Sequence, residues 1–563
     1  MKIKNYIIYG IALVASFNIV SCDVLDVDPM DSYSDAAVWG DLALAEAYLN
    51  TPYTKIMPES RKGSRYASLT EEIYQMHLYG TDNVRQGYIS PDVSGFGWDD
   101  DMWNPWNYYY GAIKQVNAFL EKIADVPVVN DGDDVWKEEL TGQAHFLRAF
   151  FYNQLYNIFG RVVLLDKTFS IDTEEFTETR ASIEDVTAFI VADCDKAISM
   201  LPVSYASAGD FGRATKGAAM ALKARTLLFA ASPLFDANYP TRSKWEAASA
   251  ANKAVIDLNA YSLKSVSSSA DYTKLFNDPQ NPEIIFQKLF DGKRTVGTNQ
   301  TFLHQSPCGS GNGYGGWGTI QPTHNVVMKF QMTDGSPYVQ GGEDEYPWAD
   351  RDLRLEGSII LDGSMWGYGS DNREVEYFVP GEKGVVAGRD SREGSAWWNA
   401  TQTGYLVKKG LDPDYDDQGT AAHTSPGIMM RLAEFYLNYA ECQIELGNNA
   451  EALKYINMVR ERALMPPATG ADIWADYEYE RQIELVFEGQ RWFDIRRWKT
   501  AEAIYKEPII GLDIKKMSDG SKKYIVKETP IETRNFYAPK NYWMAIPRSE
   551  LRRSPSLDAA PYE

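Results

Sequence analysis

The amino-acid sequence predicts a mostly α-helical protein in which two helix-rich flanks enclose a loop-rich middle region. Apolar residues recur at helical spacing over about 30–260 and again over about 427–500. The segment of about 283–426 instead carries many glycines, prolines and aromatic residues between short apolar runs. These patterns favour a helical scaffold that is interrupted by one long irregular insertion.

The N-terminus has the features of an export signal that ends at a cysteine. Lys2 and Lys4 precede the mostly apolar run Tyr6–Val20, which is shorter than the roughly 20 apolar residues that span a hydrocarbon core. This pattern is typical of a signal peptide. Cys22 follows Ile-Val-Ser and resembles the lipobox of bacterial lipoproteins, where the peptide is cut before the cysteine and the thiol is acylated. We expect residues 1–21 to be removed and Cys22 to carry lipid; an ordinary secretory signal is the alternative.

Composition argues against several classes of function. The chain of 563 residues has a formal net charge of −22, which disfavours binding to nucleic acid or to anionic lipid. After Cys22 the only cysteines are Cys194, Cys308 and Cys442, too few for a disulfide framework. Aromatic residues make up 13% of the chain, and exposed rings are well suited to hold sugars because a flat ring covers the C–H face of a pyranose.

The N-terminal flank contains most of the predicted helices. Residues Ser182 to Asp185 form a capping-box pattern that predicts the start of a helix ending near Leu201. The other helices predicted here are Asp41–Asn50, Trp106–Ile123, Val135–Phe159, Gly212–Ala231 and Trp245–Leu258.

The middle and the C-terminal flank differ in pattern. Short β-like runs such as Ile284–Phe286 occur in the middle, and helical periodicity resumes after it. The helices predicted there are Ile428–Leu446, Ala450–Leu464 and Tyr477–Lys499, followed by an irregular C-terminal segment.

A weak internal repeat is present in the helical part. Gly447–Leu453, together with Ala463 and Pro466, has the small-residue spacing of a tetratricopeptide second helix, and Trp245–Ala248 echoes it. Small residues allow two helices to approach closely, and stacked pairs bury a continuous core. No clear 34-residue period is present, so the repeats are degenerate; generic packing of alanine-rich helices is the alternative.

Several segments together resemble the SusD/RagB family of outer-membrane nutrient-binding lipoproteins, over nearly the whole chain. The most specific is Glu480–Asp494, and the tail Ser554–Pro561 departs from the family by lacking its usual asparagines and glycine. The other similar segments are Cys22–Pro29, Gly142–Ala149 with Gly160–Val162, Gly212–Lys216 with Ala224 and Arg225, Gln321–Thr323, Arg351–Leu355, Arg431–Glu434 with Asn438–Glu441, and Tyr542 and Trp543 with Pro547.

The resemblance implies a fold, a location and a partner. The fold is a right-handed superhelical scaffold of four tetratricopeptide-like helix pairs that supports an irregular ligand-binding region, with residues 22–563 as one SusD-like domain. The partner is a SusC-like TonB-dependent outer-membrane transporter, over which the lipoprotein acts as a lid. Asp23, Asp26 and Asp28, close behind the lipid-bearing cysteine, suit display on the outer face of the outer membrane.

The carboxylates of Glu480–Asp494 have two interpretations. Paired carboxylates perform acid–base chemistry in glycoside hydrolysis. Here, however, acidic and basic residues lie three apart and can meet on one helix. We therefore predict structural ion pairs rather than a hydrolytic site: Arg481 with Glu484, Glu488 with Arg491, and Asp494 with Arg497.

No metal or cofactor is expected from the sequence. Alternating carboxylates over Asp412–Asp416 resemble a calcium loop, but Asp417 and His423 occupy the places where that loop needs glycine and glutamate. A loose calcium site is the alternative to a solvated acidic loop. The five histidines show no metal-ligand spacing, and no nucleophile-elbow, phosphate-loop or dinucleotide motif occurs in strand–helix context.

Two glycine-containing segments have the composition expected of a sugar-binding surface. One is Gly95–Trp103 and the other is Cys308–Gly318, which holds six glycines. Glycine-rich segments bury their own rings poorly and let the backbone approach a ligand. Trp103 and Trp106 are expected in the core instead. The candidate ligand-binding residues are Asn83, Arg85, Trp98, Asp99, Cys308, Tyr314, Trp317 and Tyr405.

The function expected from these features is non-catalytic glycan binding at the cell surface, with delivery to the transporter. A peptide receptor of the same family is the first alternative, because the family also contains binders of protein nutrients. A surface glycosidase is the alternative from a different class. The sequence does not identify the glycan.

Overall fold

The computed structural model describes residues 34–57, 66–77, 81–96, 104–170, 176–290, 316–367, 372–411 and 424–558. Most of the regular structure in these residues is helical, as predicted. The scaffold helices are α2 (Asp35–Val38), α3 (Leu42–Thr54), α6 (Pro105–Lys122), α7 (Asp133–Phe159), α8 (Ile183–Met200), α9 (Lys216–Ala231), α10 (Arg242–Asp257), α15 (Leu432–Glu445), α16 (Asn449–Arg462), α17 (Ile473–Glu484) and α18 (Gln490–Arg497).

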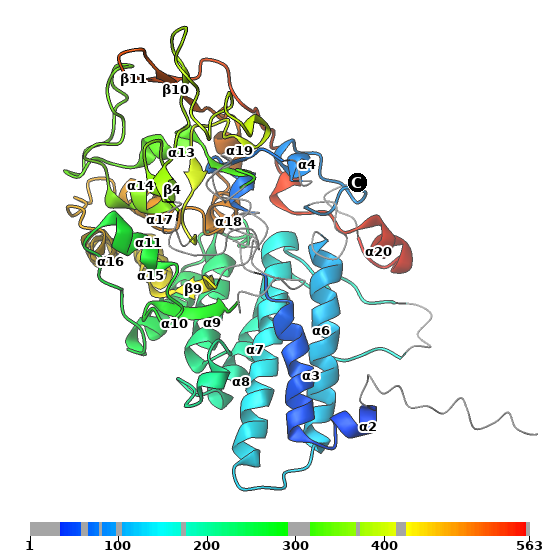
Figure 1. Ribbon diagram of the computed structural model, residues 1–563. Helices are drawn as coiled ribbons and strands as arrows, with labels where there is room; N and C mark the ends of the chain where they lie inside the picture. Colours follow the sequence, from blue (N-terminus) through cyan, green and yellow to red (C-terminus); the bar gives the residue numbers. More distant parts are fainter. Residues whose placement is uncertain are drawn as a thin grey trace, which may run out of the picture.

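Consecutive scaffold helices pack against one another from α3 and α6 through α7, α8, α9 and α10. The series continues from α10 directly to α15 and then to α16 and α17, although the whole insertion separates α10 from α15 in the sequence. Figure 1 shows α3, α6 and α7 side by side at one end of this series. The arrangement is that of stacked helix pairs, in which each pair covers the apolar face of the next.

Side-chain caps fix the starts of several helices. Ser182 accepts a hydrogen bond from the Asp185 backbone N–H at 3.0 Å, which confirms the predicted start of α8. Asp41 accepts from the N–H groups of Ala43 and Leu44 at 2.8 and 3.0 Å and so begins α3. These bonds satisfy N–H groups that have no partner within the helix.

The largest hydrophobic core lies among α3, α6, α7, α8 and α9. Helix α7 is buried on nearly every side from Gly142 to Phe159. Trp106 is buried at the start of α6, as predicted. Among the described residues no helix is long and apolar enough to cross a membrane.

The insertion consists of short elements joined by loops. Its helices are α13 (His324–Lys329) and α14 (Leu353–Ser358), and α11 (Ser269–Leu275) lies just before it in the sequence. Its strands are β2 (Ile284–Lys288), β3 (Ile320–Pro322), β4 (Ile359–Ile360), β5 (Met365–Trp366), β6 (Arg373–Glu374), β7 (Val379–Pro380) and β8 (Leu406–Val407).

Strands from outside the insertion attach it to the rest of the molecule. β1 (Ile73–Gln75), which precedes α4 (Asp82–Arg85), pairs with β3, and β9 (Gly427–Arg431) pairs with β2. The run Ile284–Phe286 thus lies in a strand, as predicted. Beyond α18 follow α19 (Ala501–Tyr505), β10 (Leu512–Lys516), β11 (Lys522–Val526) and α20 (Arg548–Arg553); β10 joins β11 to β7.

Several predicted helix boundaries were wrong. Helix α3 continues to Thr54, α9 begins only at Lys216, and α17 begins already at Ile473. Residues 428–431 form part of strand β9, because their backbone groups pair with β2 instead of starting α15. The single helix predicted over Tyr477–Lys499 is two helices, α17 and α18. Phe487 and Gly489 between them have φ of 64° and 76°, values that a right-handed helix cannot contain.

A buried ion-pair cluster joins the insertion to the scaffold. Arg354 of α14 and Arg431 of β9 both bond Glu484 of α17, with Nη1–Oε distances of 3.1 and 2.6 Å. Arg431 and Arg462 also hold Glu283, at 2.7 and 2.9 Å. The side chains of the cluster are at most 3% exposed: Glu283, Arg354, Arg431, Arg462, Glu480 and Glu484.

The carboxylates of 480–494 therefore form structural ion pairs, as predicted, but mostly with other partners. Only Asp494 and Arg497 pair at the predicted spacing, at 2.9 Å. Glu488 pairs with Arg431 and Lys409, and Arg491 pairs with Glu71 and Glu478. The break after α17 explains why the predicted pair of Glu488 with Arg491 was wrong. The predicted pair of Arg481 with Glu484 was also wrong, although both lie within α17, because Arg481 bonds Asp494 at 2.7 Å and Glu484 bonds arginines from other elements.

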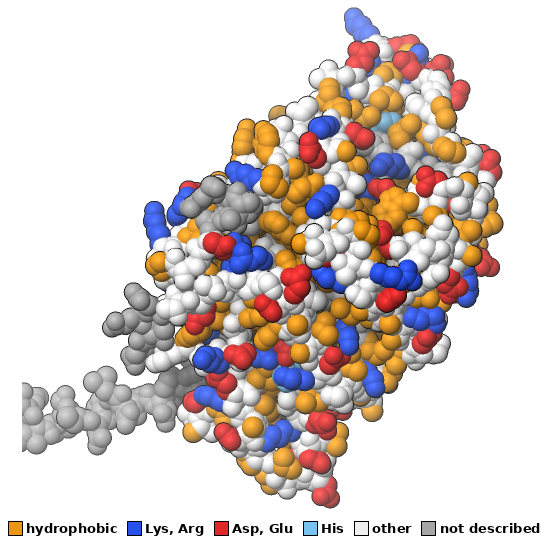
Figure 2. Space-filling view, turned by 180° about the vertical axis from the view of Figure 1, so that it is seen from behind, with side chains coloured by type: hydrophobic (Ala, Val, Ile, Leu, Met, Phe, Trp, Pro, Cys, Tyr) orange, Lys and Arg blue, Asp and Glu red, His pale blue; other side chains and the backbone are white. Residues whose placement is uncertain are grey.

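Exposed hydrophobic side chains are concentrated over the insertion. Figure 2 is turned about the vertical axis, so its upper half is the insertion end of Figure 1, and there the broadest hydrophobic areas of this face appear. The large hydrophobic side chains of the insertion that are exposed are Leu289, Trp317, Val339, Tyr346, Met365, Val386, Trp397 and Trp398. A surface of this kind is a candidate for ligand contact.

Candidate functional site

Several residues singled out from the sequence lie outside the described residues. Among the ligand-binding candidates these are Trp98, Asp99, Cys308 and Tyr314. The predicted lipidation site Cys22, Trp103 and the acidic segment from Asp412 to His423 lie outside them too. The described candidates are Asn83, Arg85, Trp317 and Tyr405.

The structure corrects the expectation for Arg85, which is fully buried at the end of α4. Its Nη1 bonds a carboxylate oxygen of Glu532 at 2.8 Å. Burial, followed by the nearby charge of Arg534, lowers the pKa of Arg85. The guanidinium is therefore part of an internal ion pair and is not presented to a ligand. Asn83, two residues earlier on the same helix, is half-buried.

The structure also corrects the expectation for Tyr405, which is fully buried. Its hydroxyl lies 2.9 Å from Nδ1 of His324, and its ring packs edge-on against Trp348. Burial, with a further contribution from Arg351, lowers the pKa of His324 to about 4, so this histidine is neutral at pH 7. Tyr405 anchors the loop that carries it rather than offering a surface to a sugar.

Trp317, Trp397 and Trp398 are three exposed tryptophans whose backbone segments meet at Asn399, and they are here named the tryptophan face. Trp317 is 37% exposed, and Trp397 and Trp398 are 61% and 56% exposed. The rings of Trp397 and Trp398 lie edge to face, with centroids 6.0 Å apart and planes at 84°. The two neighbouring indoles therefore present faces in nearly perpendicular directions.

Asn399 holds the two tryptophan-bearing segments together. It closes the single 3₁₀ turn Trp397–Asn399, and its Nδ2 donates to the Gly316 carbonyl at 3.4 Å. Its Oδ1 lies 3.1 Å from Nε2 of His77. At Gly318, where φ is 51°, a Cβ would lie 2.3 Å from the Asn399 carbonyl oxygen, so only glycine permits this approach.

A second pair of contacts makes the support behind the face rigid. The Gln321 side chain accepts from the Gln402 backbone N–H at 2.7 Å and donates to the Gly318 carbonyl at 2.7 Å. Gln321 lies on β3, which is paired with β1. The rings are thus mounted on a sheet and on the buried turn that ends at Tyr405, and the site is preorganised.

The arrangement can bind a flat, hydroxyl-bearing ligand. Indole faces cover the C–H surface of a sugar ring. The Asn399 amide, which contacts the Gly316 carbonyl and the His77 imidazole, places polar groups next to the tryptophan-bearing turn. The described residues contain no group of three His, Cys, Asp or Glu side chains placed to hold a metal ion. The carboxylates Glu480, Glu484 and Asp494 are buried and paired elsewhere.

Sequence reasoning identified Trp317 but missed Trp397 and Trp398. Their signal was present: two adjacent tryptophans follow Gly394-Ser395-Ala396 in the loop-rich insertion. Adjacent bulky rings on a short loop cannot both turn inward easily. The sequence does not predict that Asn399 in this turn contacts Gly316, which lies about 80 positions earlier in the chain.

Comparison with known proteins gives matches over most of the chain. The model of the "SusD family" matches residues 282–562, and a model described as "Starch-binding associating with outer membrane" matches residues 25–228. A SusD-like protein of Formosa agariphila is 24% identical over 91% of this chain and 94% of its own length. A SusD-like protein of Bacteroides ovatus is 23% identical over 88% and 83%.

Solved structures show the same fold. A SusD-like protein of Bacteroides fragilis superimposes with a TM-score of 0.77 at 27% identity, over 94% of this chain and 99% of the other. A SusD-like carbohydrate-binding protein of the same organism gives 0.74 at 22% identity, over 92% and 100%. The surface glycan-binding protein A of Bacteroides uniformis gives 0.63 at 18%, over 92% and 99%.

Proposed function

The chain belongs to the SusD family, and from this premise we propose that it captures oligo- or polysaccharide at the cell surface through the tryptophan face. The observation that carries the proposal is the display of Trp317, Trp397 and Trp398 on a rigid support in the insertion. Relatives described as starch-binding or carbohydrate-binding support the same ligand class.

The proposed place of action is the outer face of the outer membrane. A lipid on Cys22 would hold the protein there, since two or three acyl chains anchor a protein firmly. The proposed partner is a SusC-like TonB-dependent transporter, to which the bound glycan is delivered. The family model that matches residues 25–228 is described by its association with the outer membrane, which supports this location.

We propose that the protein itself does not cleave the glycan. Hydrolysis needs two carboxyl groups that flank the scissile bond and reach the substrate. The carboxylates Glu480, Glu484 and Asp494 of the most family-specific segment instead form ion pairs inside the protein. Delivery without cleavage is consistent with a ligand surface made of rings and amides.

The test is polysaccharide binding by the full chain, purified in a detergent without a sugar head group. A panel of polysaccharides is titrated against the wild type, the variant with Trp397→Ala and Trp398→Ala, and Tyr537→Ala. Tyr537 is the matched control, because it is an aromatic residue that is 53% exposed and lies outside the insertion. At least a tenfold loss of affinity is expected in the tryptophan variant, with the control unchanged.

Other outcomes separate the alternatives. Glycan affinity that is equal in all three proteins would refute the site. Binding of oligopeptides without any glycan response would favour a peptide receptor. Release of reducing sugar from a bound glycan, abolished by one carboxylate substitution, would favour a surface glycosidase.

A further inference from the structure

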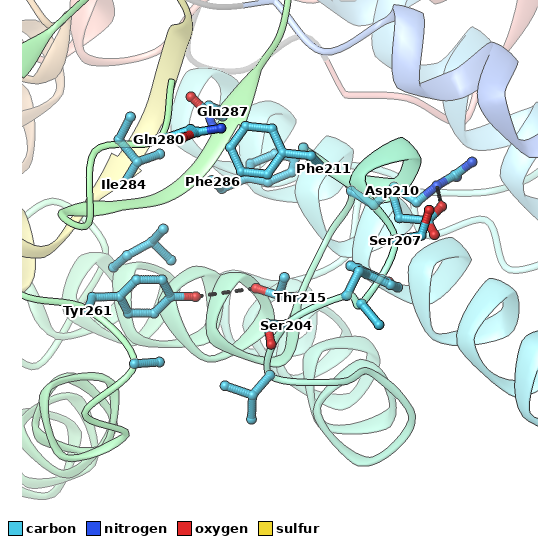
Figure 3. Close-up of a pocket in the computed structure, with 17 residues that line it drawn as sticks. Ser204, Ser207, Asp210, Phe211, Thr215, Tyr261, Gln280, Ile284, Phe286 and Gln287 are labelled. Carbon is cyan, nitrogen blue, oxygen red and sulfur yellow. Dashed lines mark hydrogen bonds and ion pairs between the residues drawn. The ribbon is translucent and has the colours of Figure 1, made fainter. Parts of the chain in front are cut away.

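A separate cavity of about 670 Å³ lies where the helical scaffold meets strand β2 of the insertion, and it shares no residue with the tryptophan face. Its walls come from the loop after α8, the start of α9, Tyr261 after α10, and strand β2 with the turn before it. The volume is within the roughly 300–1,000 Å³ of small-ligand pockets. Figure 3 shows the side chains that line it.

One side of the cavity is lined by hydroxyl groups. The hydroxyls of Tyr261 and Thr215 meet at 3.3 Å, as the dashed line in Figure 3 shows, and Ser204 lies near them. The position of Tyr261 depends on Gly217, where a Cβ would lie 2.2 Å from the tyrosine oxygen. Thr215 is also fixed, because its Oγ1 accepts from the Ala218 N–H and caps α9.

The opposite side of the cavity carries Gln287, whose amide oxygen has no hydrogen-bond donor in the described structure. Gln287 is 6% exposed, and its Nε2 donates to the Pro279 carbonyl at 2.7 Å. Its Oε1 is buried and has no hydrogen-bond partner in the structure. Figure 3 places Gln287 beside Gln280, across the cavity from Tyr261. A buried oxygen without a donor is unfavourable, so a small turn of the Gln287 side chain that brings this oxygen to a ligand hydroxyl in the cavity is favoured.

Aromatic rings complete the lining. Phe211 is 46% exposed, and Figure 3 shows its ring beside the buried Phe286. An exposed phenyl ring over hydroxyl and amide groups matches the alternation of C–H faces and hydroxyls on a sugar.

The charges at the cavity exclude an acidic ligand. Arg213 is paired with Asp210 at 2.8 Å and also bonds Glu46, so its charge is already matched by two carboxylates. Among the residues that the structure describes, no other cation lines the cavity. A carboxylate or sulfate in the ligand would therefore meet net negative charge without an available partner.

We propose that this cavity is a second carbohydrate site, which takes a short neutral oligosaccharide independently of the tryptophan face. The ligand's hydroxyls bond Gln287 and the Tyr261–Thr215 pair, and one sugar face stacks on Phe211. A scaffold site of this kind would hold the end of a chain or a released fragment, while the tryptophan face holds polysaccharide.

The experiment uses the full chain with Trp397→Ala and Trp398→Ala, so that the proposed polysaccharide surface is absent. Maltotriose, cellotriose, xylotriose, mannotriose and trigalacturonate are titrated by calorimetry in a detergent without a sugar head group. At least one neutral trisaccharide is expected to bind. Adding Phe211→Ala should weaken it at least tenfold, and adding Gln287→Leu should also weaken it.

Val129→Ala is the control, because Val129 is a 77% exposed scaffold residue outside the cavity. It should leave the affinity unchanged. Absence of binding by every neutral trisaccharide, or equal affinity with and without Phe211→Ala, would overturn the proposal whatever the polysaccharide titration shows. Trigalacturonate binding that depends on Phe211 would overturn the assignment to neutral sugars. Since Phe211 is exposed, its variant tests the cavity even if Gln287→Leu fails to fold.

Discussion

Replacing Glu484 by glutamine tests whether the buried ion-pair cluster holds the insertion on the scaffold. Glu484 is fully buried and bonds three arginines, Arg354, Arg431 and Arg462. Burial alone would raise its pKa, but the three positive charges outweigh burial and hold the pKa well below the usual value. The substitution keeps the shape of the side chain, removes the charge and replaces one acceptor oxygen by an NH₂ group that cannot accept from an arginine.

The expected loss of stability follows from the contacts. Removing one partner of a buried pair costs about 3–5 kcal/mol, because it leaves an uncompensated charge inside the protein. Glutamine keeps one acceptor oxygen, so we expect the lower end, about 3 kcal/mol. With total stabilities of roughly 5–15 kcal/mol, such a loss is a large fraction of the whole.

The assay is urea unfolding followed by tryptophan fluorescence, which reports on both the scaffold and the insertion. Glu451→Gln is the matched control: its carboxylate is 37% exposed and lies 3.8 Å from Lys454 on the surface of α16. Surface pairs of this kind contribute about 0–1 kcal/mol. If Glu484→Gln changes the free energy of unfolding by no more than the control does, the structural role of the cluster is refuted.

Two other predictions concern pH and helix packing. The burial of Glu72, and after it the negative charge of Glu71, raises the pKa of Glu72 from the ordinary 4.5 to about 8. The protonated carboxyl therefore contributes its full stability below pH 4.5, and this contribution is lost as pH rises through 8. Glu72→Gln should flatten the change in melting temperature between pH 5 and pH 9, and an unchanged pH dependence would contradict this. Gly142→Ala on α7 should destabilise by about 1–3 kcal/mol, because its Cβ would lie 2.8 Å from the Met200 Cβ. Gly111→Ala on α6 is the control: its Cβ would have no atom within 4 Å, so this substitution should stabilise the protein by up to about 1 kcal/mol. The melting temperatures of the two variants are compared by calorimetry, and equal changes would contradict close packing of α7 on α8.

Local patterns were enough to predict most helices of the scaffold. Helical periodicity and the cap at Ser182 are properties of neighbouring residues, and the structure confirms α8 within a residue of the prediction. The break between α17 and α18 was missed because the backbone at Phe487 is left-handed without being glycine. What stabilises it there is distant: Glu484 and Glu488, on either side, bond Arg431.

The candidate site was predicted only in part for the same reason. Glycine-rich sequence around Trp317 predicts an exposed ring, and this ring is 37% exposed. The same reasoning failed for Tyr405, whose preceding Gly404 has φ of 87° and turns the chain so that the ring points inward to His324. Exposure depends on what packs over a side chain, and that neighbour is usually remote in the sequence.

The sequence by itself determined the fold class, the family and the net negative charge. These depend on composition, on local periodicity and on short segments that resemble those of family members residue by residue. The tertiary structure alone decided which rings form a surface and which carboxylates are internal. Trp397 and Trp398 join Trp317 through Asn399, and Glu484 meets arginines from α14, β9 and α16. Both results depend on contacts between residues far apart in the chain, which form only when apolar burial brings the insertion onto the scaffold.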